Sequence, residues 1–210
     1  MIFYSIEMLV KAGIKEILVV TGGNNAGDFL RLLKNGKQFG LKKLDYAYQE
    51  GEKGIADALK LARDFVGSDK MVVALGDNIV EKNIKRFVTE FKKQKSGARI
   101  LLTKVKNPKE YGVAELKGKK INRIVEKPRK PKSKLAVTGI YCYPNDVFEI
   151  IRKLKPSGRG ELEITDVNNA YIKRGELKFN ILNGWWIDCG ESVDALLQAN
   201  NFVRKNGANK

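Results

Sequence analysis

The feature of the sequence that most restricts its fold is the regular alternation of short apolar runs with amphipathic segments over residues 2–106. The runs 16–20 and 71–75 are almost entirely apolar and end at glycine-containing turns, which is typical of strands buried on both faces of a sheet. The segments around them carry apolar residues at helical spacing. This order predicts an α/β protein with a mostly parallel sheet and helices on both faces.

Beyond residue 107 the pattern changes to shorter alternating segments. Residues 111–116 and 121–126 flank the turn 117–119, which predicts a β-hairpin. We expect a single domain over residues 1–210, with a Rossmann-like sheet and a β-rich insertion at 107–143. The expected helices span 2–12, 26–35, 54–66, 82–94, 145–154, 166–174 and 192–204, and the expected strands span 16–20, 44–49, 71–75, 98–106, 111–116, 121–126, 136–143 and 177–182.

The residue types that are missing exclude several kinds of chemistry. The chain has no histidine, which excludes Ser-His-Asp and Cys-His catalysis and histidine-ligated zinc. Its two cysteines, Cys142 and Cys189, are far apart and form no Cys-x-x-Cys pair, so neither a disulfide framework nor a zinc ribbon is expected. No run approaches the length of a membrane span, and the first residues lack the pattern of a signal peptide. We therefore expect a cytoplasmic protein with no membrane partner.

The strong positive charge raises nucleic acid as an alternative partner. Lys and Arg number 40 against 24 Asp and Glu, which gives a formal net charge of +16. Lysines cluster at 92–95, 117–120 and 127–134, but aromatic residues are not interleaved with them as in proteins that stack single-stranded bases. Lysines scattered over solvated faces account better for the charge. We therefore do not expect nucleic acid as the partner, and salt-dependent binding would reveal it.

Two acidic residues occupy positions that suit a metal site. Asp77 follows the run 71–75 with only Gly76 between them, and ligands of parallel sheets gather at the carboxyl ends of the strands. Asp188 lies within Trp185-Trp186-Ile187-Asp188-Cys189-Gly190. Together the two carboxylates can hold one Mg²⁺ beside the phosphates of a nucleotide. Ordinary turns at both places remain the alternative, because sequence spacing does not show that the two residues meet.

Glu126-Lys127-Pro128 places an acid and a base at the end of an expected strand. Adjacent residues of a strand point to opposite faces, but Pro128 bends the chain and can bring both side chains to one rim. A carboxylate suits sugar hydroxyls and an ammonium suits a phosphate, whereas an exposed surface pair is the alternative. The glycine-rich run 22–27 matches neither nucleotide-binding fingerprint and is expected to be a plain turn into a helix.

Several short motifs occur in one order along almost the whole chain. They are Gln49 with Gly54, Leu75-Gly76-Asp77-Asn78, Tyr111-Gly112-Val113, Glu126-Lys127-Pro128, Ala136-Val137-Thr138-Gly139, residues 158–166 (Gly-Arg-Gly-Glu-Leu-Glu-Ile-Thr-Asp) and Trp186-Ile187-Asp188-Cys189-Gly190. This ordered set resembles the sugar-phosphate nucleotidylyltransferases, and among them the thymidylyltransferases. The resemblance implies a nucleotide-diphospho-sugar transferase fold. It also implies transfer of a nucleotidyl group from dTTP to a sugar 1-phosphate such as glucose 1-phosphate, which gives a dTDP-sugar and pyrophosphate.

The resemblance further implies a role for individual residues. Asp77 and Asp188 would hold Mg²⁺ as the cofactor, and Lys127 would hold the sugar phosphate, so that Asp77 and Lys127 are the expected catalytic groups. The expected substrate contacts are Gln49 and Gly54 at the pyrimidine edge, Gly112, Glu126 and Val137 at the sugar, and Trp186. An amide offers one donor and one acceptor to thymine and uracil alike. The base, the sugar and a homo-oligomeric state are left open.

In one respect the sequence departs from the family. Members begin with a buried strand and a loop that carries Gly-x-Gly-Thr-Arg-Leu, followed by a lysine before a Pro-Met-Ile segment. Met1-Ile2 aligns with that Met-Ile, so the loop, its arginine and the lysine are not among these residues. Since such a loop gives N–H donors and positive charge to the triphosphate, we expect an N-terminally truncated chain that binds sugar nucleotides with little or no turnover. A non-catalytic sugar-nucleotide-binding remnant is one alternative.

Two smaller departures concern the base. Residues 49–52 read Gln-Glu-Gly-Glu where thymidylyltransferases carry prolines, and Asp57 stands in place of a glutamine. Both weaken the expectation of dTTP, so that a UTP-dependent enzyme, or one for another sugar phosphate, is the other alternative.

Overall fold

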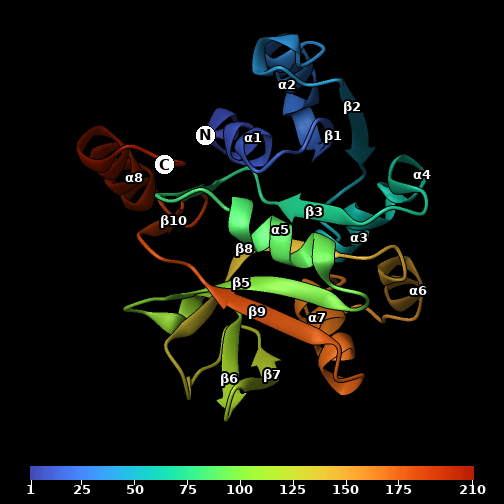
Figure 1. Cartoon of the computed structure of the whole chain (residues 1–210), viewed down its shortest axis with the longest axis vertical. Helices are drawn as coiled ribbons and strands as arrows, with labels where there is room; N and C mark the ends of the chain where they lie inside the picture. The colour runs from blue at the N-terminus through green and yellow to red at the C-terminus, as the bar shows by residue number, and fades with distance from the viewer.

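A computed structural model describes residues 1–210, apart from the side chain of Asn25 (Figure 1). Its helices are α1 (Ile2–Lys11), α2 (Ala26–Leu33), α3 (Ile55–Lys60), α4 (Arg63–Val66), α5 (Lys85–Lys93), α6 (Val147–Arg152), α7 (Ile164–Lys173) and α8 (Val193–Asn206), with 3₁₀ turns η1 (Gly23–Asn25), η2 (Lys37–Phe39) and η3 (Pro108–Glu110). Its strands are β1 (Glu16–Gly22), β2 (Lys43–Gln49), β3 (Met71–Ala74), β4 (Asn78–Val80), β5 (Ala98–Lys104), β6 (Val113–Lys117), β7 (Lys120–Val125), β8 (Leu135–Tyr143), β9 (Leu177–Ile181) and β10 (Trp186–Asp188). Among the described residues, none of the helices has the length and apolar character that crossing a lipid bilayer requires.

Strand β8 organises the largest sheet, whose order is β7-β6-β8-β5-β9 with β3 also paired to β8. One edge of β8 pairs antiparallel with β5 along most of its length. The opposite edge changes partner, because Ala136 pairs with Val113 of β6 whereas Ile140 pairs with Ala74 of β3. The expected α/β fold is confirmed, but the sheet is mixed, because β8 runs antiparallel to β3, β5 and β6 while β5 and β9 run parallel.

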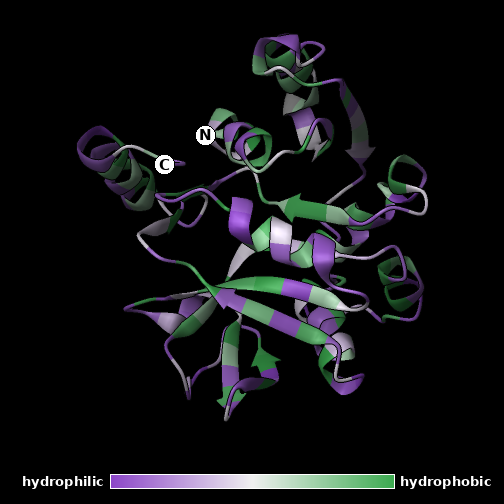
Figure 2. Cartoon of the chain, in the orientation of Figure 1, coloured by the Kyte–Doolittle hydropathy of each residue, from purple (hydrophilic) through white to green (hydrophobic). Residues whose placement is uncertain are grey.

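Helices cover both faces of this sheet, as the alternation of side chains along β5 requires. Ala98, Ile100 and Leu102 belong to a buried cluster that includes side chains of α3, α6 and α7. Leu101 belongs to a second cluster with α1 and α5. Each fully buried Leu or Ile stabilises the fold by about 1.5–3 kcal/mol relative to an exposed one. Figure 2 shows the result: β3 is hydrophobic along its whole length, whereas α5 carries both hydrophobic and hydrophilic stripes.

Two small sheets flank the largest one. Strands β1 and β2 pair in parallel from Glu16 with Lys43 to Gly22 with Gln49, and they share a buried cluster with α1 and with Val72 of β3. Strands β4 and β10 pair antiparallel, with Asp188 opposite Asn78. In Figure 1, β1 and β2 lie above β3, whereas β6 and β7 lie at the opposite end of the molecule. Strands β3 and β6 nevertheless pair with the same edge of β8.

The expected elements are present with two differences. The single helix expected over 54–66 is two short helices, because the chain tightens at Leu61 and Ala62 into hydrogen bonds to the third residue back. Strands β4 and β10 were not expected, since each has only three residues and exists through its pairing with the other. The hairpin of β6 and β7 is confirmed. Ser192 caps α8, where its hydroxyl accepts a hydrogen bond from the Ala195 N–H.

Candidate active site

Most of the predicted site residues gather where β8 changes partner from β6 to β3, whereas Gln49 and Gly54 lie at the end of β2. At this point the Val137 N–H donates to the Gly112 carbonyl over 2.8 Å, and the Leu75 N–H donates to the Gly139 carbonyl over 2.9 Å. The loop after β3 and the loop before β6 therefore lie side by side along β8. We call the place where these two loops meet the crevice, because ligands of open α/β sheets bind where neighbouring strands part.

Asp77 and Asp188, far apart in the sequence, meet in this crevice. Pairing of β4 with β10 brings them together, and the Cys189 N–H donates to the Asp77 carbonyl over 2.9 Å. Gly190 borders both carboxylates: a Cβ atom on it would lie 2.5 Å from Asp77 Oδ2 and 3.4 Å from Asp188 Oδ1. The sequence left open whether the two acids meet, and the structure brings them together.

The electrostatics of Asp188 reflect this proximity. Burial, followed by the negative charge of Asp77, raises the pKa of Asp188 above its usual value. The hydrogen bond from the Gly190 N–H, 3.0 Å long, and the positive charge of Lys127 act in the opposite direction. A bound cation between the two acids would remove their repulsion. Within the part of the chain that the structure describes, no cluster of three or more His, Cys, Asp or Glu side chains is placed to hold a metal, so a cation here would take its other ligands from water or substrate.

Asn78, which the sequence analysis did not single out, fixes the Asp77 side chain. Its Nδ2 donates to Asp77 Oδ1 over 2.8 Å. Its Oδ1 accepts from the Gly139 N–H over 2.9 Å and from the Trp186 indole N–H over 2.7 Å. Because two donors hold the oxygen, the amide nitrogen must face Asp77. Its position directly after Asp77 was the only available signal.

Two aromatic rings cover one side of the crevice. The rings of Tyr111 and Trp186 meet edge to face with centroids 5.2 Å apart. The Tyr111 hydroxyl donates to the Glu191 carboxylate, and burial followed by this hydrogen bond raises the pKa of Tyr111. Of these three residues only Trp186 was predicted.

Glu126 follows the end of β7, where Thr165 of α7 holds it. The Thr165 hydroxyl donates to Glu126 Oε2 over 2.6 Å. A Cβ on Gly112 would lie 3.2 Å from Glu126 Oε2 and 3.4 Å from Thr165 Oγ1, so only glycine leaves this carboxylate and hydroxyl unobstructed. Gly112, Glu126 and Val137 are thus brought together as expected, and Thr165 is an addition from the run 158–166. A hollow of about 460 Å³ between β7 and α7 reaches Glu126 and Thr165.

Lys127 follows Glu126 beyond the end of β7, in a left-handed conformation with φ of 38°. Its N–H donates to the Tyr111 carbonyl over 3.1 Å. Its positive charge acts on both Asp188 and Glu163. Burial tends to raise the pKa of Glu163, but hydrogen bonds from Arg159 and Ser157 and the nearby positive charges lower it below its usual value. The exposed Lys127 thus lies within electrostatic reach of both sides of the crevice.

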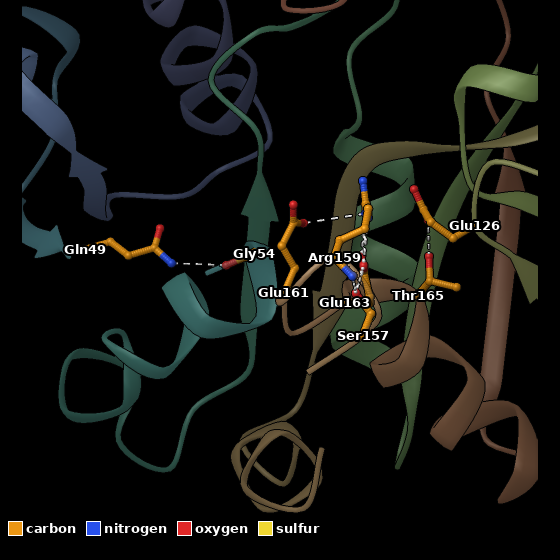
Figure 3. A network of polar contacts seen from close by, with 8 residues as sticks. All are labelled: Gln49, Gly54, Glu126, Ser157, Arg159, Glu161, Glu163 and Thr165. Atoms are coloured by element: carbon orange, nitrogen blue, oxygen red, sulfur yellow. Dashed lines mark hydrogen bonds and ion pairs between the residues drawn. The ribbon is translucent and has the colours of Figure 1, made fainter. Parts of the chain in front are cut away.

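Gln49 and Gly54 meet at the end of β2. Gln49 Nε2 donates to the Gly54 carbonyl over 3.1 Å and to Asp57 Oδ2 over 3.1 Å. Figure 3 shows this pair beside the loop of residues 157–163, in which Arg159 bridges to Glu163. In this view they lie apart from Glu126 and Thr165.

The sequence was compared with known proteins. The family model described as nucleotidyl transferase matches residues 1–206. The chain therefore belongs to the nucleotidyl transferase family, and the resemblance that its motifs carry is confirmed.

Two bacterial relatives show the similarity in sequence. The glucose-1-phosphate thymidylyltransferase of Mycolicibacterium smegmatis is 41% identical over 213 residues, covering 97% of this chain and 71% of the relative. That of Neisseria meningitidis is 39% identical over 208 residues, covering 97% and 72%.

Two solved structures have a similar fold. A Bacillus anthracis protein assigned as a glucose-1-phosphate thymidylyltransferase, in complex with sucrose, superposes with a TM-score of 0.92 at 47% identity and covers 97% of this chain and 82% of its own. A UDP-glucose pyrophosphorylase complexed with UDP-glucose superposes with a TM-score of 0.82 at 25% identity, covering 96% and 85%.

Proposed function

We propose that this protein transfers a thymidylyl group from dTTP to glucose 1-phosphate, giving dTDP-glucose and pyrophosphate. The observation that carries the proposal is the convergence of Asp77 and Asp188 beside Gly190, while the neighbouring loop along β8 holds Gly112 against the Glu126–Thr165 pair. Two acids suit the metal-bound phosphates of a nucleotide, and a fixed carboxylate beside an open glycine suits sugar hydroxyls. The names of the relatives agree with this reaction.

The chemistry asks the protein mainly for positioning and charge neutralisation. A phosphate oxygen of glucose 1-phosphate attacks the α-phosphorus of dTTP, a new P–O bond forms, and the bond to the β-phosphate oxygen breaks as pyrophosphate leaves. Lys127 would bind the sugar phosphate, while Glu126, Gly112 and Val137 would hold the sugar in line. Trp186 would close the side of the crevice, and Gln49 with Gly54 would contact the base.

The donor set in the crevice fits Mg²⁺. Asp77 and Asp188 offer hard oxygen ligands, and Gly190 leaves the space beside them free of a side chain. When bound, the ion would neutralise charge on the phosphates. We further propose a role in dTDP-sugar biosynthesis in the cytoplasm, because Cys142 and Cys189 are both free thiols, as a reducing compartment favours. Residues 107–143 would supply most of the sugar contacts.

The test measures turnover and binding separately, so that a loss of either can be assigned to the residue that is changed. Pyrophosphate release and dTDP-glucose formation are followed with Mg²⁺, dTTP and glucose 1-phosphate, and dTDP-glucose binding is followed by calorimetry. Asp77→Ala should lower Mg²⁺-dependent turnover or binding by about 100-fold, whereas Asp64→Ala, an exposed acid on α4, should leave both unchanged. Failure to form or bind dTDP-glucose, or full activity of Asp77→Ala, would overturn the proposal.

A further inference from the structure

Both hydrogen-bond donors of the Gln49 side chain are bound to other groups of the protein. An amide nitrogen carries two N–H groups, and Gln49 Nε2 donates one to the Gly54 carbonyl and one to Asp57 Oδ2, each over 3.1 Å. Only the oxygen Oε1 is left to meet a ligand. In Figure 3 this oxygen points away from the bond to Gly54.

The orientation of this amide is fixed, because both of its partners can only accept. A backbone carbonyl has no hydrogen to donate, and neither has an ionised carboxylate. Burial tends to raise the pKa of Asp57, but hydrogen bonds from Lys60 and Gln49 and nearby positive charges lower it below its usual value. Asp57 is therefore ionised at neutral pH. A flipped amide would place Oε1 against two acceptors and lose both bonds.

The Gly54 carbonyl is itself held in place. Gly54 has a φ of 91°, and a Cβ on it would lie 2.6 Å from the Leu162 carbonyl. Around it, the Leu162 N–H donates to the Lys53 carbonyl over 2.8 Å and the Ala56 N–H donates to the Leu162 carbonyl over 3.2 Å. These bonds attach the loop after β2 to the loop before α7, so the acceptor that faces Gln49 does not turn freely.

We propose that Asp57 is a positioning residue that makes Gln49 an acceptor-only contact, so that the base must present an N–H group to Gln49 Oε1. This inference rests on the proposed function, in which Gln49 faces the edge of the base. Thymine and uracil carry an N–H at N3, whereas cytosine has a bare lone pair there. The arrangement therefore selects pyrimidines with an N3–H, and it does so through a residue, Asp57, that departs from the glutamine of the thymidylyltransferases.

The first test changes the ligand. Binding and turnover are compared for dTTP, for N3-methyl-dTTP, which lacks the N–H, and for UTP and CTP. We expect dTTP and UTP to be accepted, and N3-methyl-dTTP and CTP to be weaker by about 10- to 100-fold, as for a hydrogen bond replaced by an unpaired buried acceptor. Equal use of N3-methyl-dTTP and dTTP, or of CTP and UTP, would overturn the inference and leave the proposed function standing. Failure of all four nucleotides would overturn both.

The second test changes the residue. In Asp57→Asn the side chain can offer a donor to Gln49, so the amide is no longer held in one orientation. We expect the preference for UTP over CTP to fall by about 10-fold, while the matched variant Asp64→Asn keeps the wild-type ratio. Because the readout is a ratio of two ligands on one protein, general destabilisation does not change it. An unchanged ratio in Asp57→Asn shows that Asp57 does not position Gln49.

Discussion

Asn78 Nδ2 donates a 2.8 Å hydrogen bond to Oδ1 of Asp77, and the same amide accepts from Gly139 and Trp186. Asn78 is almost fully buried, with 1% of its surface exposed. One side chain thus ties the carboxylate of the loop after β3 to β8 and to β10. Groups that orient a metal ligand in this way change metal affinity when they are removed.

Replacing Asn78 with leucine keeps the branched shape of the side chain and removes these bonds. We expect Asn78→Leu to raise the Mg²⁺ concentration for half-maximal activity by about 10-fold or more. We also expect it to lower the free energy of unfolding by about 2–3 kcal/mol, because two buried N–H donors lose their acceptor. A Mg²⁺ titration and urea unfolding measure the two effects. Ser5→Ala is the control: Ser5 donates to carbonyls of the same loop without touching the Asp77 carboxylate, so it should leave the Mg²⁺ requirement unchanged.

The repulsion between Asp77 and Asp188 predicts that a variant without one of the two charges is more stable but responds less to Mg²⁺. Asp188→Asn removes one of two like charges and keeps the oxygen that accepts from the Gly190 N–H. Without Mg²⁺, this variant should be more stable than the wild type by about 1 kcal/mol. Addition of Mg²⁺ should raise the melting temperature of the wild type and not that of Asp188→Asn. Calorimetric melting with EDTA and with Mg²⁺ checks both statements, and equal Mg²⁺ shifts in the two proteins would contradict the assignment of Asp188 as a ligand.

The closeness of Gly190 to the acids makes it sensitive to one added methyl group. In Gly190→Ala the Cβ would lie 2.5 Å from Asp77 Oδ2, so the carboxylate must move. A displacement of this size should lower turnover by about 100-fold, with little loss of stability because Gly190 is exposed. Gly158→Ala is the matched control, since a Cβ there has no neighbour within 4 Å. Wild-type kinetics for Gly190→Ala would show that the acids need no free space beside them.

Lys127 combines an expected binding role with a strained backbone, and the two can be separated. Lys127→Gly and Lys127→Ala both lose the ammonium, so both should raise the KM for glucose 1-phosphate by about 10-fold or more. Only glycine relieves the φ of 38°, so Lys127→Gly should be more stable than Lys127→Ala by about 1 kcal/mol. The same pair of variants at Lys34, with φ of 52° in the turn after α2, should show the stability difference without the kinetic effect.

The sequence by itself determined the alternation of elements and the residue types of the site. The apolar run of β3 predicts a strand inside the sheet, and the structure has that strand, although its residues are half-buried and not fully buried as expected. The spacing in α1 and α5 gives each helix one apolar face, and the absence of histidine restricts the chemistry to carboxylates, lysines and amides. The ordered motifs identified the family and pointed to Asp77 and Asp188. These properties are local, so they can be read from neighbouring residues.

Only the tertiary structure decided how distant segments meet. The antiparallel course of β8, the three-residue pairing of β4 with β10, and the hydrogen bonds of Asn78 and Asp57 join residues that are separated in the chain or that point in directions the sequence does not state. The physical reason is that a hydrogen bond or a charge interaction depends on the distance and direction between two groups. Those are set by the packing of the whole sheet, whereas burial of an apolar run is set by its own composition.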